Sequence, residues 1–315
     1  MAPNSLFPLE LKGAMNTFLQ QLVNGLTVGS FYALVALGYT MVYGVIRLIN
    51  FAHGDLYMVG AFAGFTLLTA FGGVAQHLSG VLLIPLAFLI PMGTVGALGV
   101  VLERVAYRPL RRAPRLSPLI TAIGLSLGLE EGSRLGWGAS FQVYPSIFPT
   151  TIWQVGGVTI SAMQVIILPV TVGLMACLYL FVQRTMAGKA MRAVAIDQDA
   201  AQLMGIDVDA VIALTFFIGA MLAAAAGVMA GGFYSEIDFN MGFLIGLKAF
   251  TAAVLGGIGN IPGAMVGGYL LALLQGFFAG YISSQWSDVF AFSVLILVLV
   301  FRPTGILGER VVEKV

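Results

Sequence analysis

Long stretches without a charged residue alternate with short polar segments along this chain. The uncharged stretches are residues 13–46, 56–102, 135–183, 210–235 and 249–287. Each is longer than the roughly 20 apolar residues that a helix needs to cross a bilayer. The pattern predicts an all-α, polytopic membrane protein in which residues 1–315 form one transmembrane domain, with no room for a separate soluble catalytic domain.

Within these stretches we expect eight or nine membrane segments, some of them interrupted. Their ranges are 16–46, 55–70, 82–103, 117–136, 162–183, 211–231, 241–258, 261–281 and 287–301. The count depends on residues 47–55, RLINFAHGD, which form either a cytoplasmic turn or a break within the membrane. Composition agrees with a membrane protein, because 9% of the residues are charged, whereas soluble chains carry about a quarter.

Basic residues indicate the topology. Eleven of the 15 lie in three short segments, at 104–115, 184–192 and 302–314. The positive-inside rule predicts that all three segments are cytoplasmic, which puts the C-terminus inside and the N-terminus outside. A net charge of +1 without a concentrated basic face argues against nucleic acid as a partner and leaves membrane lipid as the surroundings.

Two apolar stretches, one in each half of the chain, are interrupted in a similar way. The first interruption carries Asn50, His53 and Asp55, and the second carries Gly256, Gly257, Gly259 and Asn260. Unwound backbone is tolerated at membrane depth only where protein or a water-filled cavity satisfies its polar groups. The two interruptions either approach each other beside a solute path or are tight turns.

Few polar side chains suggest chemistry. His53 and Asp55 fall short of a metal shell, so a proton relay, a substrate contact and a satisfied hinge all stay open. Lys248 lies deep enough to snorkel toward the membrane surface. Residues Glu130, Glu131 and Arg134 could pair with one another. The sequence contains neither a phosphate-binding loop nor a nucleophile elbow, so we expect no ATP site, no cofactor and no enzymatic activity in this chain.

Glycines recur at four-residue spacing in several segments. The sets are Gly25 and Gly29; Gly60 and Gly64; Gly259, Gly263 and Gly267; and Gly124, Gly128, Gly132 and Gly136. Such spacing lines one helix face with small residues and lets helices approach closely. The pattern predicts helix packing rather than a functional site.

The segment 184–209, RTMAGKAMRAVAIDQDAAQLMGIDVD, is mixed in charge and lacks proline. We expect a short helix that ends near Gly205, after which Asp207 caps the next span. A compact cytoplasmic helix between two spans offers a partner a surface to push against, although a charged turn without function fits the spacing equally well.

This segment resembles the ATPase-coupling segment of branched-chain amino acid ABC-transporter permeases of the LivH type. The stretches NGLTVGSFYALVALGYTMVYGVIRLINFAHGDLYMVGAF, ERVAYRPLR, VIALTFFIGAMLAAAAGVMAG, LKAFTAAVLGGIGNIPGAM and RPTGILGERVVEKV are similar to the same family. The coupling residues that the resemblance implies are Gly188, Arg192, Ala193, Asp197, Ala200 and Gly205. Arg192 is the charge we expect to pair across the contact.

The resemblance further implies an importer of the bacterial inner membrane. Its partners would be a second, LivM-like permease, two cytoplasmic ATPases that bind ATP and Mg²⁺, and a periplasmic or lipid-anchored substrate-binding protein. The external loop 137–161 and the surroundings of Glu130 and Glu131 depart from the family pattern. Two alternatives stay open: a permease of the same family for urea or small amides, and a self-contained secondary transporter or channel.

Overall fold

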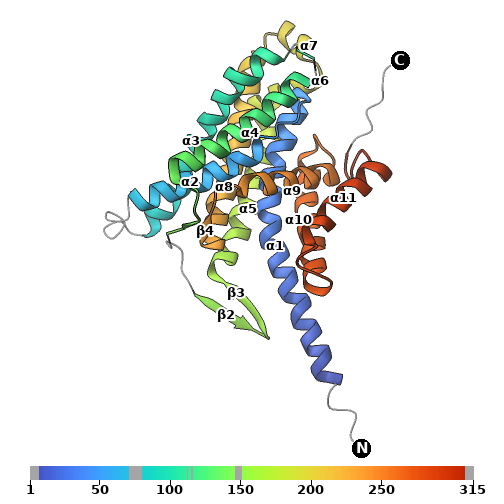
Figure 1. Ribbon diagram of the computed structural model, residues 1–315. Helices are drawn as coiled ribbons and strands as arrows, with labels where there is room; N and C mark the ends of the chain where they lie inside the picture. The colour runs from blue at the N-terminus through green and yellow to red at the C-terminus, as the bar shows by residue number, and fades with distance from the viewer. Residues whose placement is uncertain (1–6, 71–79, 112, 115, 146–150, 309–315) are drawn as a thin grey trace, which may run out of the picture.

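A computed structural model of the chain describes residues 7–70, 80–111, 113–114, 116–145 and 151–308. One long helix, α1 (Phe7–Ile46), runs through the whole molecule, as Figure 1 shows. Its 40 residues form a rod of about 60 Å, twice the thickness of a bilayer core. Helices α2, α5, α6, α8, α9 and α10 contact this rod.

Helix α2 (His53–Ala70) begins beside α1 rather than beyond its end. The ring of His53 lies so close to Gly38 that a Cβ there would overlap it. Gly38 precedes the end of α1 by eight residues, so α2 starts about 12 Å inside that end. Of the two alternatives for residues 47–55, the structure therefore has the break within the bundle.

The next two helices both contact α2. Helix α3 (Gly80–Leu102) continues into a π-helical turn (Glu103–Tyr107) and a 3₁₀ turn (Arg108–Leu110). The chain then returns through α4 (Leu116–Trp137). Single π-turns inside helices re-aim the side chains that follow, and here the following residues include the arginines of the first basic segment.

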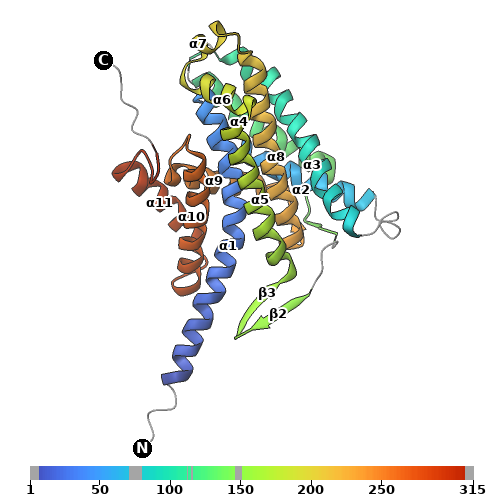
Figure 2. The same cartoon turned by 180° about the vertical axis from the view of Figure 1, so that it is seen from behind.

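The third quarter of the chain contains two long helices joined by two short ones. They are α5 (Ala162–Arg184), α6 (Met186–Ile196), α7 (Gln198–Leu203) and α8 (Val208–Tyr234). Ser161 starts α5 with a capping box, which satisfies backbone N–H groups that a helix start leaves free. Figure 2 shows α5 beside α1, with α6 and α7 at one end of the molecule.

Three further helices complete the bundle: α9 (Met241–Gly256), α10 (Ile261–Tyr281) and α11 (Ser287–Phe301). Both views show α10 and α11 on one side of α1 and α2 and α3 on the other (Figures 1 and 2). Helix α9 contacts both groups, because it packs against α2 as well as α10 and α11.

Four short strands lie between the helices, none of which the hydropathy pattern predicts. Strand β1 (Gln142–Val143) pairs antiparallel with β4 (Glu236–Ile237). Strands β2 (Ile152–Val155) and β3 (Val158–Ser161) form a hairpin. The hairpin lies at the opposite end of the molecule from α6 and α7, near the start of α1 (Figure 1).

Among the residues that the structure describes, five helical stretches are long and apolar enough to cross a bilayer. They are Gly13–Ile46, Leu83–Leu110, Ala162–Arg184, Val208–Tyr234 and Ile261–Tyr281. Helices α9 and α11 are apolar but only 16 and 15 residues long. The expectation of an all-α, multi-pass membrane protein is confirmed. The described helices that meet the length needed to cross a bilayer are fewer than the eight or nine membrane segments that we predicted.

The three basic segments gather at one end of the bundle, which we call the α6 end. Arg111 pairs with Asp209 at 2.6 Å and with the buried Glu103, which joins the first segment to the start of α8. At the same end, the side-chain amide of Asn260 donates to the carbonyl oxygen of Leu307 at 2.8 Å. Residues 112, 115 and 309–315, which carry part of the predicted basic charge, lie outside the described residues.

The glycine sets differ in what they contact. Gly25 and Gly29 lie against α10, and Gly60 lies against the backbone of Ala224 in α8. A Cβ at any of four positions in α4 would instead meet nothing within 4 Å, and these positions are Gly124, Gly128, Gly132 and Gly136. The packing prediction is therefore met for α1 and α2, whereas the glycines of α4 pack against none of the residues that the structure describes.

Candidate functional site

Helix α6 is attached to the end of α5 by a sharp turn. The hydroxyl of Thr185 accepts a hydrogen bond from the backbone N–H of Gly188 at 3.0 Å and so caps α6. At Gly188 the two helices come so close that a Cβ would collide with the carbonyl oxygen of Val182. Only glycine fits this contact without displacing one of the helices.

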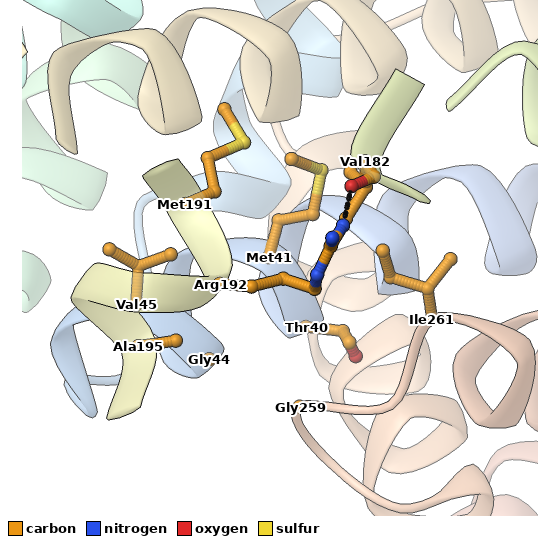
Figure 3. Close-up of a pocket in the computed structure, with 10 residues that line it drawn as sticks. All are labelled: Thr40, Met41, Gly44, Val45, Val182, Met191, Arg192, Ala195, Gly259 and Ile261. Carbon is orange, nitrogen blue, oxygen red and sulfur yellow. Dashed lines mark hydrogen bonds between the residues drawn. The ribbon is translucent and has the colours of Figure 1, made fainter. Parts of the chain in front are cut away.

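Arg192 makes the second connection between α6 and α5. Its guanidinium donates to the carbonyl oxygen of Val182, as the dashed line in Figure 3 marks. A cation at this place also interacts favourably with the negative end of the α5 dipole. We expected the charge of Arg192 to pair with a partner protein, but one of its donors is used within this chain.

The coupling segment contains two helices, where the sequence predicted one. Asp197 has extended backbone angles, φ −154° and ψ 113°, and its side chain accepts from the N–H of Ala200 at 2.9 Å. An aspartate that bonds ahead to the backbone offers an N-cap in place of a continuous helix, which explains the break. The rest of the prediction holds, because Gly205 (φ +84°) follows α7 and Asp207 caps α8.

The outer face of this segment is unusually apolar for an exposed surface. The large apolar side chains exposed there are Met186, Ile196, Leu203 and Met204. Ala200 is exposed between them and Ala193 is half-buried. Exposed apolar patches on otherwise well-packed proteins mark contact sites, so α6 and α7 together form a candidate docking surface.

The inner face of α6 lines a cavity of about 600 Å³ at the α6 end. Arg47 from the first interruption lines it, together with Gly259 and Asn260 from the second and Arg192 from α6. A smaller cavity of about 100 Å³ adjoins it, and Figure 3 shows Arg192 and Gly259 among its walls. Helix α6 and the turn between α9 and α10 thus line the same cavities.

The second interruption is a glycine-rich turn with two left-handed residues. Gly257 has φ +108° and Gly259 has φ +94°, which residues with a Cβ rarely adopt. Asn260 then caps α10, since its side chain accepts from the N–H of Gly263 at 2.9 Å. The carbonyl oxygen of Gly256 accepts from the N–H of Leu307 at 3.0 Å. The C-terminal segment therefore holds this turn in place.

The polar residues of the first interruption are buried in the middle of the bundle. Asn50 accepts a hydrogen bond from the hydroxyl of Tyr107 at 2.6 Å. His53 fills the space between Gly38 of α1 and Gly219 of α8. Asp55 is 1% exposed. The bundle thus surrounds these three side chains with helices on every side rather than exposing them at its surface.

The two interruptions meet at their edges only. Ile49 and Ile258 line one small cavity between α1 and α9. The neighbours of His53 and Asp55 in α9 are different, since Gly54 contacts the first turns of that helix at Gly246. Ten residues separate Gly246 from Gly256, a distance of about 15 Å along a helix. Gly54 and Asp55 thus contact α9 near its start, whereas the second interruption follows the end of this helix.

Two groups of polar residues were not anticipated as partners. Lys248, which we expected to snorkel toward the membrane surface, pairs with the half-exposed Asp288 of α11 at 2.7 Å. Gln275 donates to the same aspartate at 3.0 Å and accepts from the hydroxyl of Tyr32 at 2.9 Å. A lone lysine in an apolar helix indicates that Lys248 needs an acidic partner, but the sequence does not identify Asp288 as that partner.

Comparison with known proteins agrees with this arrangement. Residues 21–299 match the family described as the permease component of branched-chain amino acid transport systems. The chain is 50% identical to the high-affinity branched-chain amino acid transport permease BraD of Pseudomonas aeruginosa and 48% identical to LivH of Escherichia coli, each over 95% of this chain and 98% of the relative. No solved structure matches. The chain therefore belongs to the family of branched-chain amino acid transport permease components.

Proposed function

We propose that this chain is a permease subunit of a bacterial importer that moves branched-chain amino acids inward across the inner membrane. The observation that carries the proposal is the position of α6 and α7, which expose apolar side chains outward and share a cavity with the α9–α10 turn inward. A force that a docked partner exerts on this surface is transmitted to the membrane helices over a short distance. Family membership and the names of the close relatives support the substrate.

The energy source in this proposal is ATP hydrolysis by separate subunits. The chain has no phosphate-binding loop of its own, so ATP and Mg²⁺ bind to two cytoplasmic ATPases that dock on the coupling residues of α6 and α7. The remaining partners are a second, LivM-like permease and a substrate-binding protein outside. The basic α6 end then faces the cytoplasm, and the C-terminus lies on that side.

The two interrupted regions have separate roles in this proposal. The turn at Gly256, Gly257, Gly259 and Asn260 receives motion from α6, because both line one cavity. The buried group of Asn50, His53 and Asp55 lies where α2 begins inside the bundle, which is the position of a solute path in transporters with broken helices. In this proposal α2, α4, α9 and α11 are also membrane segments, and together with the five long spans they make nine, the upper of the two numbers that the sequence predicts.

Copurification tests the proposal against a self-contained transporter. An affinity-tagged chain is isolated from native membranes in mild detergent, and its partners are identified by mass spectrometry. We expect a second permease and an ATPase in fixed proportion to the tagged chain. A tagged chain that purifies alone and still carries leucine along an ion gradient would overturn the proposal. Preferential uptake of urea by the complex would favour the small-amide alternative.

A further inference from the structure

A second cavity lies between α4 and α9, away from the coupling segment. Its volume is about 620 Å³, within the range typical of small-molecule sites. Apolar side chains from both helices form most of the walls, chiefly Ile123, Leu127, Phe243 and Leu244. Three polar side chains also line it, namely Ser126, Glu130 and Asn240. The described lining contains an acid and no basic residue.

Glu130 is free to bind a ligand. The sequence suggested that Arg134 pairs with the acidic residues near it, and in the structure Arg134 binds Glu131 at 2.6 Å. Glu130 forms no ion pair and no hydrogen bond within the described ranges of the chain. A carboxylate beside apolar walls attracts a cation strongly, because water screens the interaction poorly there.

Asp55 is a second acidic residue near this cavity, although it is not part of the lining. It is 1% exposed, and neither of its carboxylate oxygens has a hydrogen-bond partner of normal geometry among the described residues. The carboxylate lies between α4 and α9, beside the cavity. On one side a Cβ at Gly242 of α9 would stand 2.8 Å from Oδ1, and on the other side it faces Ser126 of α4. Buried carboxylates without partners are costly, so a positive charge in this cavity would stabilise Asp55 as well.

We propose that the α4–α9 cavity binds an aliphatic amino acid as its zwitterion, with the ammonium group at Glu130 and the side chain between Ile123, Leu127 and Phe243. The hydroxyl of Ser126 and the side-chain amide of Asn240 also line the cavity and are neutral hydrogen-bond donors for the carboxylate of the ligand. The inference rests on the proposed function and adds a substrate site to it. The charge of the lining excludes strongly anionic solutes.

Photo-crosslinking locates the ligand directly. The complete complex in lipid nanodiscs is irradiated with photo-leucine, a leucine analogue with a diazirine in its side chain, and the labelled peptides are identified. We expect label in residues 116–137 and 241–256 that excess leucine removes. Glu130→Gln should lower the labelling about tenfold or more, the loss expected for one charge-assisted hydrogen bond. Glu131→Gln is the matched control and should stay within about twofold of the wild type.

Competitors test the chemistry of the site. 3-Methylbutylamine keeps the cation and the branched chain of leucine and should reduce the labelling, whereas 4-methylpentanoate lacks the cation and should not. Lipid amines are tested by comparing nanodiscs of phosphatidylglycerol alone with nanodiscs that also contain phosphatidylethanolamine. Loss of the label whenever phosphatidylethanolamine is present would identify a lipid as the occupant and overturn the inference.

Transport measured on the same preparations separates the two proposals. If the wild-type complex imports leucine but label falls outside α4 and α9, or Glu130→Gln is labelled like the wild type, this inference fails and the permease function stands. If the wild-type complex does not import leucine, the proposed function fails, and the substrate assigned to this cavity fails with it.

Discussion

Gly54 in the first turn of α2 lies directly against Gly246 in α9. A Cβ built on Gly54 would stand 2.6 Å from the Cα of Gly246 and 2.5 Å from the carbonyl oxygen of Gly242. The two interrupted helices thus cross with backbone against backbone. Small residues permit such an approach in lipid, where packing rather than burial drives helix association.

Gly54→Ala should therefore destabilise the bundle. Its Cβ meets backbone atoms, which cannot move aside as a side chain can, and overpacking typically costs about 1–3 kcal/mol. We expect a lower melting temperature of the purified complex and reduced transport. Gly93→Ala in α3 is the control, because a Cβ there meets nothing within 4 Å. An unchanged melting temperature for Gly54→Ala would show that α2 and α9 do not cross in this way.

Arg111 and Arg108 should differ sharply in their contribution to stability, although both contact Asp209. Arg111 also pairs with Glu103, whose side chain is 1% exposed, so Arg111→Ala leaves a buried charge without a partner, at a cost of about 3–5 kcal/mol. The pair of Arg108 with Asp209 is nearly half-exposed on both sides. Arg108→Ala should cost about 0–1 kcal/mol. Thermal unfolding of the two variants gives the comparison, and equal losses would contradict it.

Ala200→Phe should uncouple transport without unfolding the protein. Ala200 is exposed on α7, so the larger ring disturbs no internal packing but obstructs a docked ATPase. We expect leucine transport and transport-linked ATP hydrolysis to fall at least fivefold, a loss of about 1 kcal/mol at the contact, while membrane insertion is unchanged. The exposed Ala139, in the loop after α4, gives the control Ala139→Phe. Equal activity of both variants would show that the ATPase contacts another surface.

Cysteine labelling should place the α6 end in the cytoplasm. The native Cys177 is exposed and is first replaced by serine. A cysteine introduced at Lys189 should then react with an impermeant maleimide only after the cells are opened, whereas one at Ala139 should react in intact cells. Reaction of Lys189→Cys from outside would reverse the topology and remove the basis for a cytoplasmic ATPase contact.

Local signals in the sequence predict the outer helices closely. The predicted spans 162–183, 261–281 and 287–301 agree with α5, α10 and α11. Each of these helices begins where an apolar run meets a polar residue, as at Ser161 and Asn260. Capping and hydropathy act over one turn or one span, so a single sequence contains the information needed to place such helices.

Features that depend on distant contacts were not predictable in the same way. Asp288 lies 40 residues from Lys248, and β4 pairs with a strand more than 90 residues earlier in the chain. The depth at which α2 begins follows from the contact of His53 with Gly38 and Gly219. Glu130 and Glu131 are adjacent residues of the same type, and only the fold shows that Arg134 forms its ion pair with Glu131. Tertiary packing decides these partners.

Uptake of radiolabelled leucine into proteoliposomes tests the central claim most directly. The vesicles contain this chain with the subunits that copurify with it, and the substrate-binding protein is added on the side opposite the ATPases. We predict uptake that requires both ATP and the binding protein and that an ion gradient cannot replace. Leucine uptake by this chain alone, driven by an ion gradient without ATP, would contradict the account.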